Sequence, residues 1–170
     1  MRKKAQGKIH PTAVAALTAA VLFSICACSA DGTSDAADKA ETKTVGEGEQ
    51  LVIPISEVSE TAQFYPVNVN GTEMEIIAVK DSSGNIRTAF NTCQICYDSG
   101  RGYYKQVGEL FVCQNCGNRF TAEQIEIQAG GCNPYPIFDT DKTVTDDSIV
   151  ISYDFLEESR KIFLNWKMSY

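Results

Sequence analysis

Two closely spaced pairs of cysteines hold most of the chemistry that this sequence offers. They are Cys93-Gln94-Ile95-Cys96 and Cys113-Gln114-Asn115-Cys116, which together follow the spacing C-x2-C-x16-C-x2-C. Two residues between cysteines form a tight knuckle that aims both sulfurs at one point, and two knuckles supply four thiolates. The spacing therefore predicts a tetrahedral metal site on Cys93, Cys96, Cys113 and Cys116.

The spacing leaves the nature of the site open. Zinc, a single iron and an iron–sulfur cluster all accept four cysteines. A second interpretation is that the cysteines form disulfides, since the expected compartment is oxidising. A third is that one pair alone acts as a redox dithiol. A further cysteine, Cys132, follows two glycines. It is a candidate for an additional ligand, for a neighbour of the ligands, or for a small buried residue in a glycine-rich turn.

Composition excludes several common classes of site. The only histidine is His10, which lies in an N-terminal segment that we expect to be removed. The mature chain would then lack the imidazole that histidine-dependent triads, zinc hydrolases and haem sites require. The formal net charge of −7 argues against nucleic-acid binding. We therefore expect a metal-binding protein or electron carrier rather than an enzyme with turnover.

The N-terminus has the features of a bacterial lipoprotein signal. A basic start is followed by a small, apolar run over residues 13–25, shorter than the roughly 20 residues that span a bilayer as a helix. Ile25-Cys26-Ala27-Cys28 resembles a lipobox, which implies cleavage after Ala27 and lipid attachment at Cys28. We expect residues 1–27 to be the signal peptide and the protein to be anchored in the bilayer through Cys28, facing the extracytoplasmic side of the cell membrane.

Residues 28–50 and 51–170 differ sharply in composition. The first stretch is acidic, lacks aromatic residues and has one branched aliphatic residue, Val45, so it is predicted to be a disordered tether. The second is predicted to be one mostly β (α+β) domain: a small meander or hairpin sheet, a zinc-ribbon-like double cysteine knuckle and a short C-terminal helix. Strands are expected at 51–55, 63–69, 72–79, 86–90, 103–107, 110–112 and 148–152.

Local signals place the turns and the helix. Asn70-Gly71 between two alternating runs predicts a tight hairpin. The strand over 86–90 leads into the first cysteine pair, and a second hairpin would return the other pair beside it. Thr121 begins a capping-box pattern. Asp154 is the expected cap of the C-terminal helix. Its expected buried face is Phe155, Leu156, Ser159, Ile162 and Phe163.

At the cysteines, the chain resembles the FtrD-like membrane iron–sulfur proteins over roughly residues 51–165. The resemblance is carried by both knuckles, by the Gly-Gly-Cys-Asn-Pro run that contains Cys132, and by the stretch Val79-Lys80-Asp81-Ser82-Ser83-Gly84. It implies an iron–sulfur or related metal centre on Cys93, Cys96, Cys113 and Cys116, with Cys132 as a further family cysteine. It also implies association with a membrane iron permease or an associated redox protein.

Two hypotheses from different classes follow. The first is a membrane-tethered metal module, holding an iron–sulfur cluster or a single iron, that transfers electrons or otherwise assists iron uptake. The second is a zinc-stapled β domain that binds a protein partner and performs no redox chemistry. Bound iron and visible absorption would distinguish the first from the second.

Overall fold

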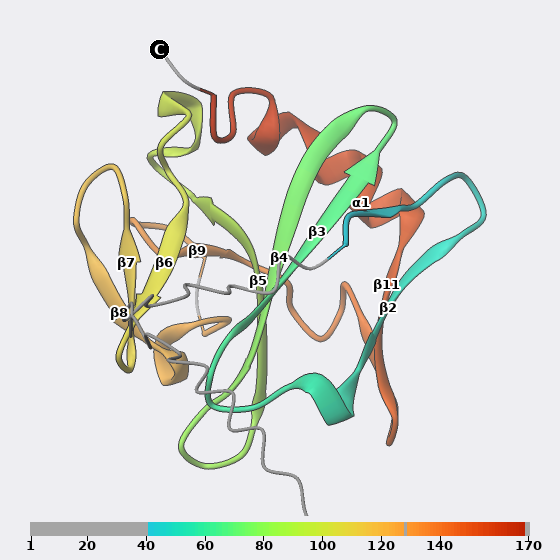
Figure 1. The fold of residues 1–170 in the computed structure, drawn as a ribbon, viewed down its shortest axis with the longest axis horizontal. Helices are drawn as coiled ribbons and strands as arrows, with labels where there is room; N and C mark the ends of the chain where they lie inside the picture. The colour runs from blue at the N-terminus through green and yellow to red at the C-terminus, as the bar shows by residue number, and fades with distance from the viewer. Residues whose placement is uncertain (1–40, 128, 169–170) are drawn as a thin grey trace, which may run out of the picture. The chain divides into compact units, whose positions relative to one another are not determined.

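The computed structural model describes residues 41–127 and 129–168, which form three β-sheets and a short helix (Figure 1). Sheet A is central and has the strand order β1-β3-β4-β5-β9, in which β1 is parallel to β3 and the other neighbours are antiparallel. Its strands are β1 (Lys43–Thr44), β3 (Gln63–Val69), β4 (Thr72–Lys80), β5 (Ile86–Cys93) and β9 (Pro134–Pro136).

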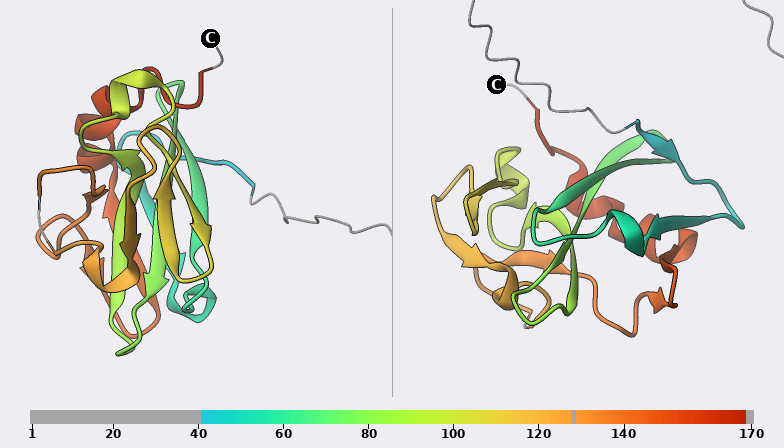
Figure 2. Two further views of the ribbon diagram at one scale, coloured as in Figure 1. Left: turned by 90° about the vertical axis from the view of Figure 1, so that its left-hand side faces the viewer. Right: turned by 60° about the horizontal axis from the view of Figure 1, so that its bottom comes forward.

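Two smaller antiparallel sheets accompany sheet A. Sheet B consists of β10 (Thr143–Val144), β11 (Ser148–Ser152) and β2 (Gln50–Pro54). Sheet C consists of β6 (Tyr104–Val107), β7 (Leu110–Cys113) and β8 (Arg119–Thr121). Figure 2 shows sheets B and C on opposite sides of sheet A. The prediction of a mostly β fold is confirmed, and β2, which contains Pro54, is an edge strand as expected.

Both faces of sheet A are covered, so it separates two apolar cores. Met74 and Ile76 of β4 pack with sheet B and the C-terminal helix, whereas Ile77 and Val79 of the same strand pack on the side of sheet C. Alternation along a strand produces this division, because successive side chains point to opposite faces. The cysteines Cys93, Cys96 and Cys113 belong to the core beside sheet C.

The predicted hairpin at Asn70-Gly71 is confirmed. Asn70 has φ 48° and Gly71 has φ 82°, the pair of positive values that a two-residue turn of this kind requires. It sets the register of β3 against β4, from Gln63 opposite Ala78 to Val69 opposite Thr72. This long hairpin is the rigid centre of sheet A, and β5 extends it toward the cysteines.

The predicted C-terminal helix is present and is short. It comprises α1 (Tyr153–Ser159) followed by a 3₁₀ helix (Arg160–Phe163). The cap differs from expectation: Ser152, not Asp154, is the N-cap, and its hydroxyl accepts a hydrogen bond from the backbone N–H of Phe155 at 3.3 Å. Asp154 instead lies in the first turn, where its charge favours the helix dipole. The predicted capping box at Thr121 is present, over a 3₁₀ helix (Ala122–Gln124).

Order begins earlier in the chain than composition suggested. Lys43–Thr44 pairs with β3, and Val45 is buried in the core beside sheet B. The composition of this short polar segment gives no reason for it to be ordered. It becomes a strand because the edge of β3 offers backbone hydrogen bonds. The proposed signal peptide, lipobox and Cys28 lie outside the described residues. Within the described ranges, no helix has the length and apolar character needed to cross a membrane.

Candidate metal centre

The first cysteine knuckle is formed where β5 ends. Cys93 is the last residue of β5, beyond an irregularity in its pairing with β9. The backbone N–H of Cys96 turns back and donates to Cys93 Sγ at 3.4 Å. Gly102 packs under this knuckle, where a Cβ would lie 2.9 Å from the backbone nitrogen of Tyr97 and collide with the Cys96 carbonyl. The knuckle therefore requires glycine at this position.

The second knuckle is the turn between β7 and β8. Cys113 ends β7, and Gly117 has φ 73°, which lets its N–H donate to the Cys113 carbonyl at 2.9 Å. Gln114 N–H donates to the Tyr103 carbonyl at 2.8 Å, which anchors the knuckle to the neighbouring strand. The hairpin between the knuckles brings the second pair beside the first, as the sequence predicted.

Cys132 reaches the same place from a third segment, the turn before β9. Two glycines with positive φ, Gly130 and Gly131, precede it. The side chain of Gln94, inside the first knuckle, fastens this turn: its Oε1 accepts from Gly130 N–H at 2.6 Å and its Nε2 donates to the Pro134 carbonyl at 3.3 Å. The backbone N–H of Gln94 also donates to the Asn133 carbonyl at 3.2 Å.

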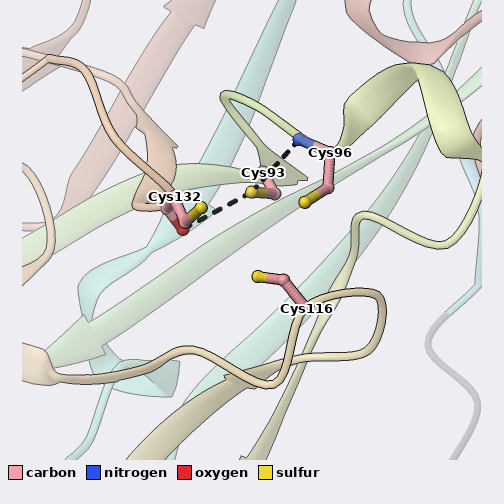
Figure 3. Close-up of side chains that lie close together, drawn as sticks. All are labelled: Cys93, Cys96, Cys116 and Cys132. Carbon is pink, nitrogen blue, oxygen red and sulfur yellow. Dashed lines mark hydrogen bonds between the residues drawn. The ribbon is translucent and has the colours of Figure 1, made fainter.

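Four sulfurs converge. The Sγ atoms of Cys93, Cys96, Cys116 and Cys132 all lie within 4.8 Å of one another, and Figure 3 shows their side chains pointing into a common space. Cys113, which the sequence predicted as a ligand, is not within this distance of all the others; it is buried in the core beside sheet C, and its thiol donates to the Cys116 sulfur. Cys116 is exposed, so the cluster has one corner at the surface.

Buried polar groups fix the floor of the site. The Tyr104 hydroxyl donates to the Cys132 carbonyl, and the Cys93 thiol approaches the same oxygen at 3.5 Å. Asn91 of β5 holds Tyr104 in turn, because its Oδ1 accepts from Tyr104 N–H at 2.7 Å. Burial, together with the neighbouring Cys93, keeps the pKa of Tyr104 above its ordinary value. Sequence reasoning missed Tyr104, Asn91 and Gln94, since nothing in their types or spacing marks them as partners of the cysteines.

The cysteine thiols of the site differ in pKa. Burial raises the pKa of Cys96 to about 11 and that of Cys113 to about 12, and it also raises that of Cys132. Burial opposes ionisation of Cys116 too, yet its pKa lies below the ordinary value because the backbone N–H of Asn118 and neighbouring thiols donate to it. Of these four thiols, Cys116 at the exposed corner therefore ionises most readily, and filling the site must release protons from the others.

The spacing of the sulfurs can be compared with the spacing that each kind of metal group requires. Four thiolates bound at about 2.3 Å to one ion lie about 3.8 Å apart in a tetrahedron, a separation inside the 4.8 Å limit that holds for the sulfurs here. An iron–sulfur cluster places sulfide between its irons and spreads its cysteine sulfurs over a wider frame. The four sulfurs within 4.8 Å thus suit one ion as they stand, whereas a cluster would require the knuckles and the Cys132 turn to move apart.

The region that contains the cysteines matches one known protein family. A family model described as membrane iron-sulfur containing protein FtrD-like matches residues 58–163. The chain belongs to the FtrD-like family. The matched region includes both knuckles and Cys132, in agreement with the resemblance seen in the sequence. No curated protein and no solved structure matches the chain.

Proposed function

We propose that this FtrD-like protein is an extracytoplasmic metal protein, tethered to the bacterial cell membrane through Cys28, that serves an iron-uptake system as an electron carrier. Its centre would be a single iron ion bound by Cys93, Cys96, Cys116 and Cys132. The observation that carries the proposal is the convergence of these four sulfurs within 4.8 Å. The family description, which names a membrane iron-sulfur protein, supports iron over other metals.

The residues around the site suit an electron carrier. An iron bound by four thiolates changes valence by one electron while keeping the same ligands. Sheet A, the two knuckles and the Gln94 contacts hold the sulfurs on rigid elements, which limits reorganisation when the charge changes. Cys116 is exposed whereas Cys93 is fully buried, so electrons would enter and leave at the Cys116 corner. The partner would be a membrane iron permease or a redox protein associated with it.

One experiment separates this proposal from its alternative, a zinc-stapled β domain that binds a protein partner. The mature chain, with Cys28 replaced by Ala, is purified without oxygen, and its metal content and visible spectrum are measured. Bound iron with absorption that changes on reduction supports the proposal. Colourless protein with stoichiometric zinc would favour the protein-binding module, and metal-free protein with disulfides would exclude both.

A further inference from the structure

A buried ion pair outside the cysteine cluster joins β5 to the segment that leads to Cys132. The Lys142 side chain is 1% exposed and its ammonium contacts the carboxylate of Glu126, which is 7% exposed. Lys142 Nζ also donates to Thr88 Oγ1 at 2.9 Å and to the Ile137 carbonyl at 3.1 Å, and it approaches the exposed Asp139 carboxylate at 3.3 Å. Because desolvating two charges is costly, such a pair is weak evidence for stability alone.

The carboxylate of Glu126 acts on β5 as a strand partner would. Its Oε2 accepts from the backbone N–H of Thr88 at 2.6 Å and from the Thr88 hydroxyl at 3.1 Å. Thr88 lies in β5, the strand that ends at Cys93. The side chain of Glu126 therefore ties its own segment to the strand that positions the first knuckle.

The backbone of Glu126 shows that this attachment constrains the chain. Its φ is 67°, a left-handed value that costs a residue other than glycine on the order of 1 kcal/mol. From Glu126 the chain runs toward Gly130, Gly131 and Cys132, and the two glycines give that stretch little stiffness of its own. The placement of Cys132 therefore depends on anchors at both ends: Glu126 with Lys142 at the start and the Gln94 contacts at the end.

We propose that Glu126 and Lys142 are positioning residues for the metal centre, which hold the Cys132 segment against β5 so that the Cys132 sulfur stays beside the other three. This inference rests on the proposed function in that Cys132 is taken as a ligand. It goes beyond that function by assigning control of one ligand to an ion pair that touches none of the cysteines.

The test uses the full chain, purified in detergent, with both charges removed together. The variant Glu126→Gln with Lys142→Met replaces the pair by neutral side chains of similar size, so neither charge is left buried alone. The matched control is Asp81→Asn with Arg87→Met, which removes another ion pair adjoining β5. In that pair the Asp81 side chain is 2% exposed, and its carboxylate lies 2.9 Å from the Arg87 guanidinium. Thr88→Val is the milder variant if the double variant does not fold, because it removes the hydroxyl that contacts both Glu126 and Lys142 and leaves the two charges paired.

Two measurements report on the position of Cys132: the affinity for Zn²⁺ and the rate at which Cys132 is alkylated. The affinity for Zn²⁺, measured by competition with a chromophoric chelator, should fall about tenfold or more in the Glu126/Lys142 variant, as for other supports of metal ligands, and stay unchanged in the control. In reduced, metal-free protein, alkylation of Cys132 by iodoacetamide, read by peptide mass spectrometry, should be faster in the variant only. In a Cys132→Ala background, the same charge removal should cause no further loss of affinity.

The outcomes are distinct. Equal losses of thermal stability in the two variants, with Zn²⁺ affinity and Cys132 alkylation unchanged, would overturn the proposal and leave the pair a structural one. If the wild-type chain bound neither zinc nor iron, the proposed function would fail. The alkylation measurement needs no metal and would still decide the positioning role: faster alkylation of Cys132 supports it, and an unchanged rate overturns it.

Discussion

Cys113→Ala and Cys132→Ala should rank differently in two measurements. Cys113→Ala should cost more unfolding free energy in the metal-free protein, and Cys132→Ala should cost more metal affinity. The Cys113 side chain is 1% exposed and packs in the core beside sheet C, whereas Cys132 is partly exposed. Removing a buried sulfur from a packed core costs about 1–2 kcal/mol of unfolding free energy. In the metal-free protein, Cys113→Ala should therefore be the more destabilising change, and Cys132→Ala should be close to neutral.

For metal binding, we expect Cys132→Ala to be the more damaging of the two substitutions. Structural zinc sites in small domains contribute about 10–16 kcal/mol over four ligands, so an even share is about 3 kcal/mol, or roughly 100-fold in affinity, for each ligand. Cys132→Ala should lose about this much, whereas Cys113→Ala should keep most of the affinity because its sulfur lies outside the four-sulfur set. Urea unfolding with and without Zn²⁺, together with chelator competition, measures both orders. If Cys113→Ala abolished binding while Cys132→Ala retained it, the ligands would be the two knuckles alone.

Three further changes test the supports of the site. Tyr104→Phe removes the hydroxyl that donates to the Cys132 carbonyl but keeps the ring, so unfolding free energy should fall by about 1–3 kcal/mol in chemical denaturation; an unchanged value would mean that the carbonyl finds another donor. Gly102→Ala should prevent the first knuckle from closing, seen as loss of metal binding, because the new Cβ meets the Cys96 carbonyl; normal binding would contradict the packing. Hydrogen bonds from Asn85 and the contact with Arg87 hold the pKa of Asp81 at about 2, below its ordinary 3.8, so the stability that Asp81 contributes is present above pH 3.8 and is lost as the pH falls toward 2. Acid unfolding should therefore be less steep over that interval in Asp81→Asn, and identical acid profiles would argue against the shift.

Much of the fold was predictable because its signals are local. A two-residue hairpin turn requires two positive φ values, which Asn70-Gly71 adopts more readily than most dipeptides. The alternating runs on either side then pair as a hairpin. The C-terminal helix was equally visible from its buried face, although its cap was placed at Asp154 instead of Ser152. Both residue types make good caps, so sequence alone could not choose between them.

The site was predictable only in part because its remaining components come from distant segments. Spacing within each knuckle indicated Cys93, Cys96, Cys113 and Cys116, but whether Cys132 joins them depends on how the turn before β9 packs against the first knuckle. The contacts of Gln94 that hold this turn cross from one segment to another. The same holds for Glu126 and Lys142, which are ordinary surface residue types in the sequence and become buried only when both segments pack against Thr88 of β5.

X-ray absorption at the metal edge of protein purified without oxygen would show whether a single metal ion is bound by four cysteine sulfurs. We expect one shell of four sulfur atoms at about 2.3 Å and no second metal nearby. A metal–metal distance in the spectrum, accompanied by acid-labile sulfide, would contradict it and show that the knuckles and the Cys132 turn move apart to hold a cluster.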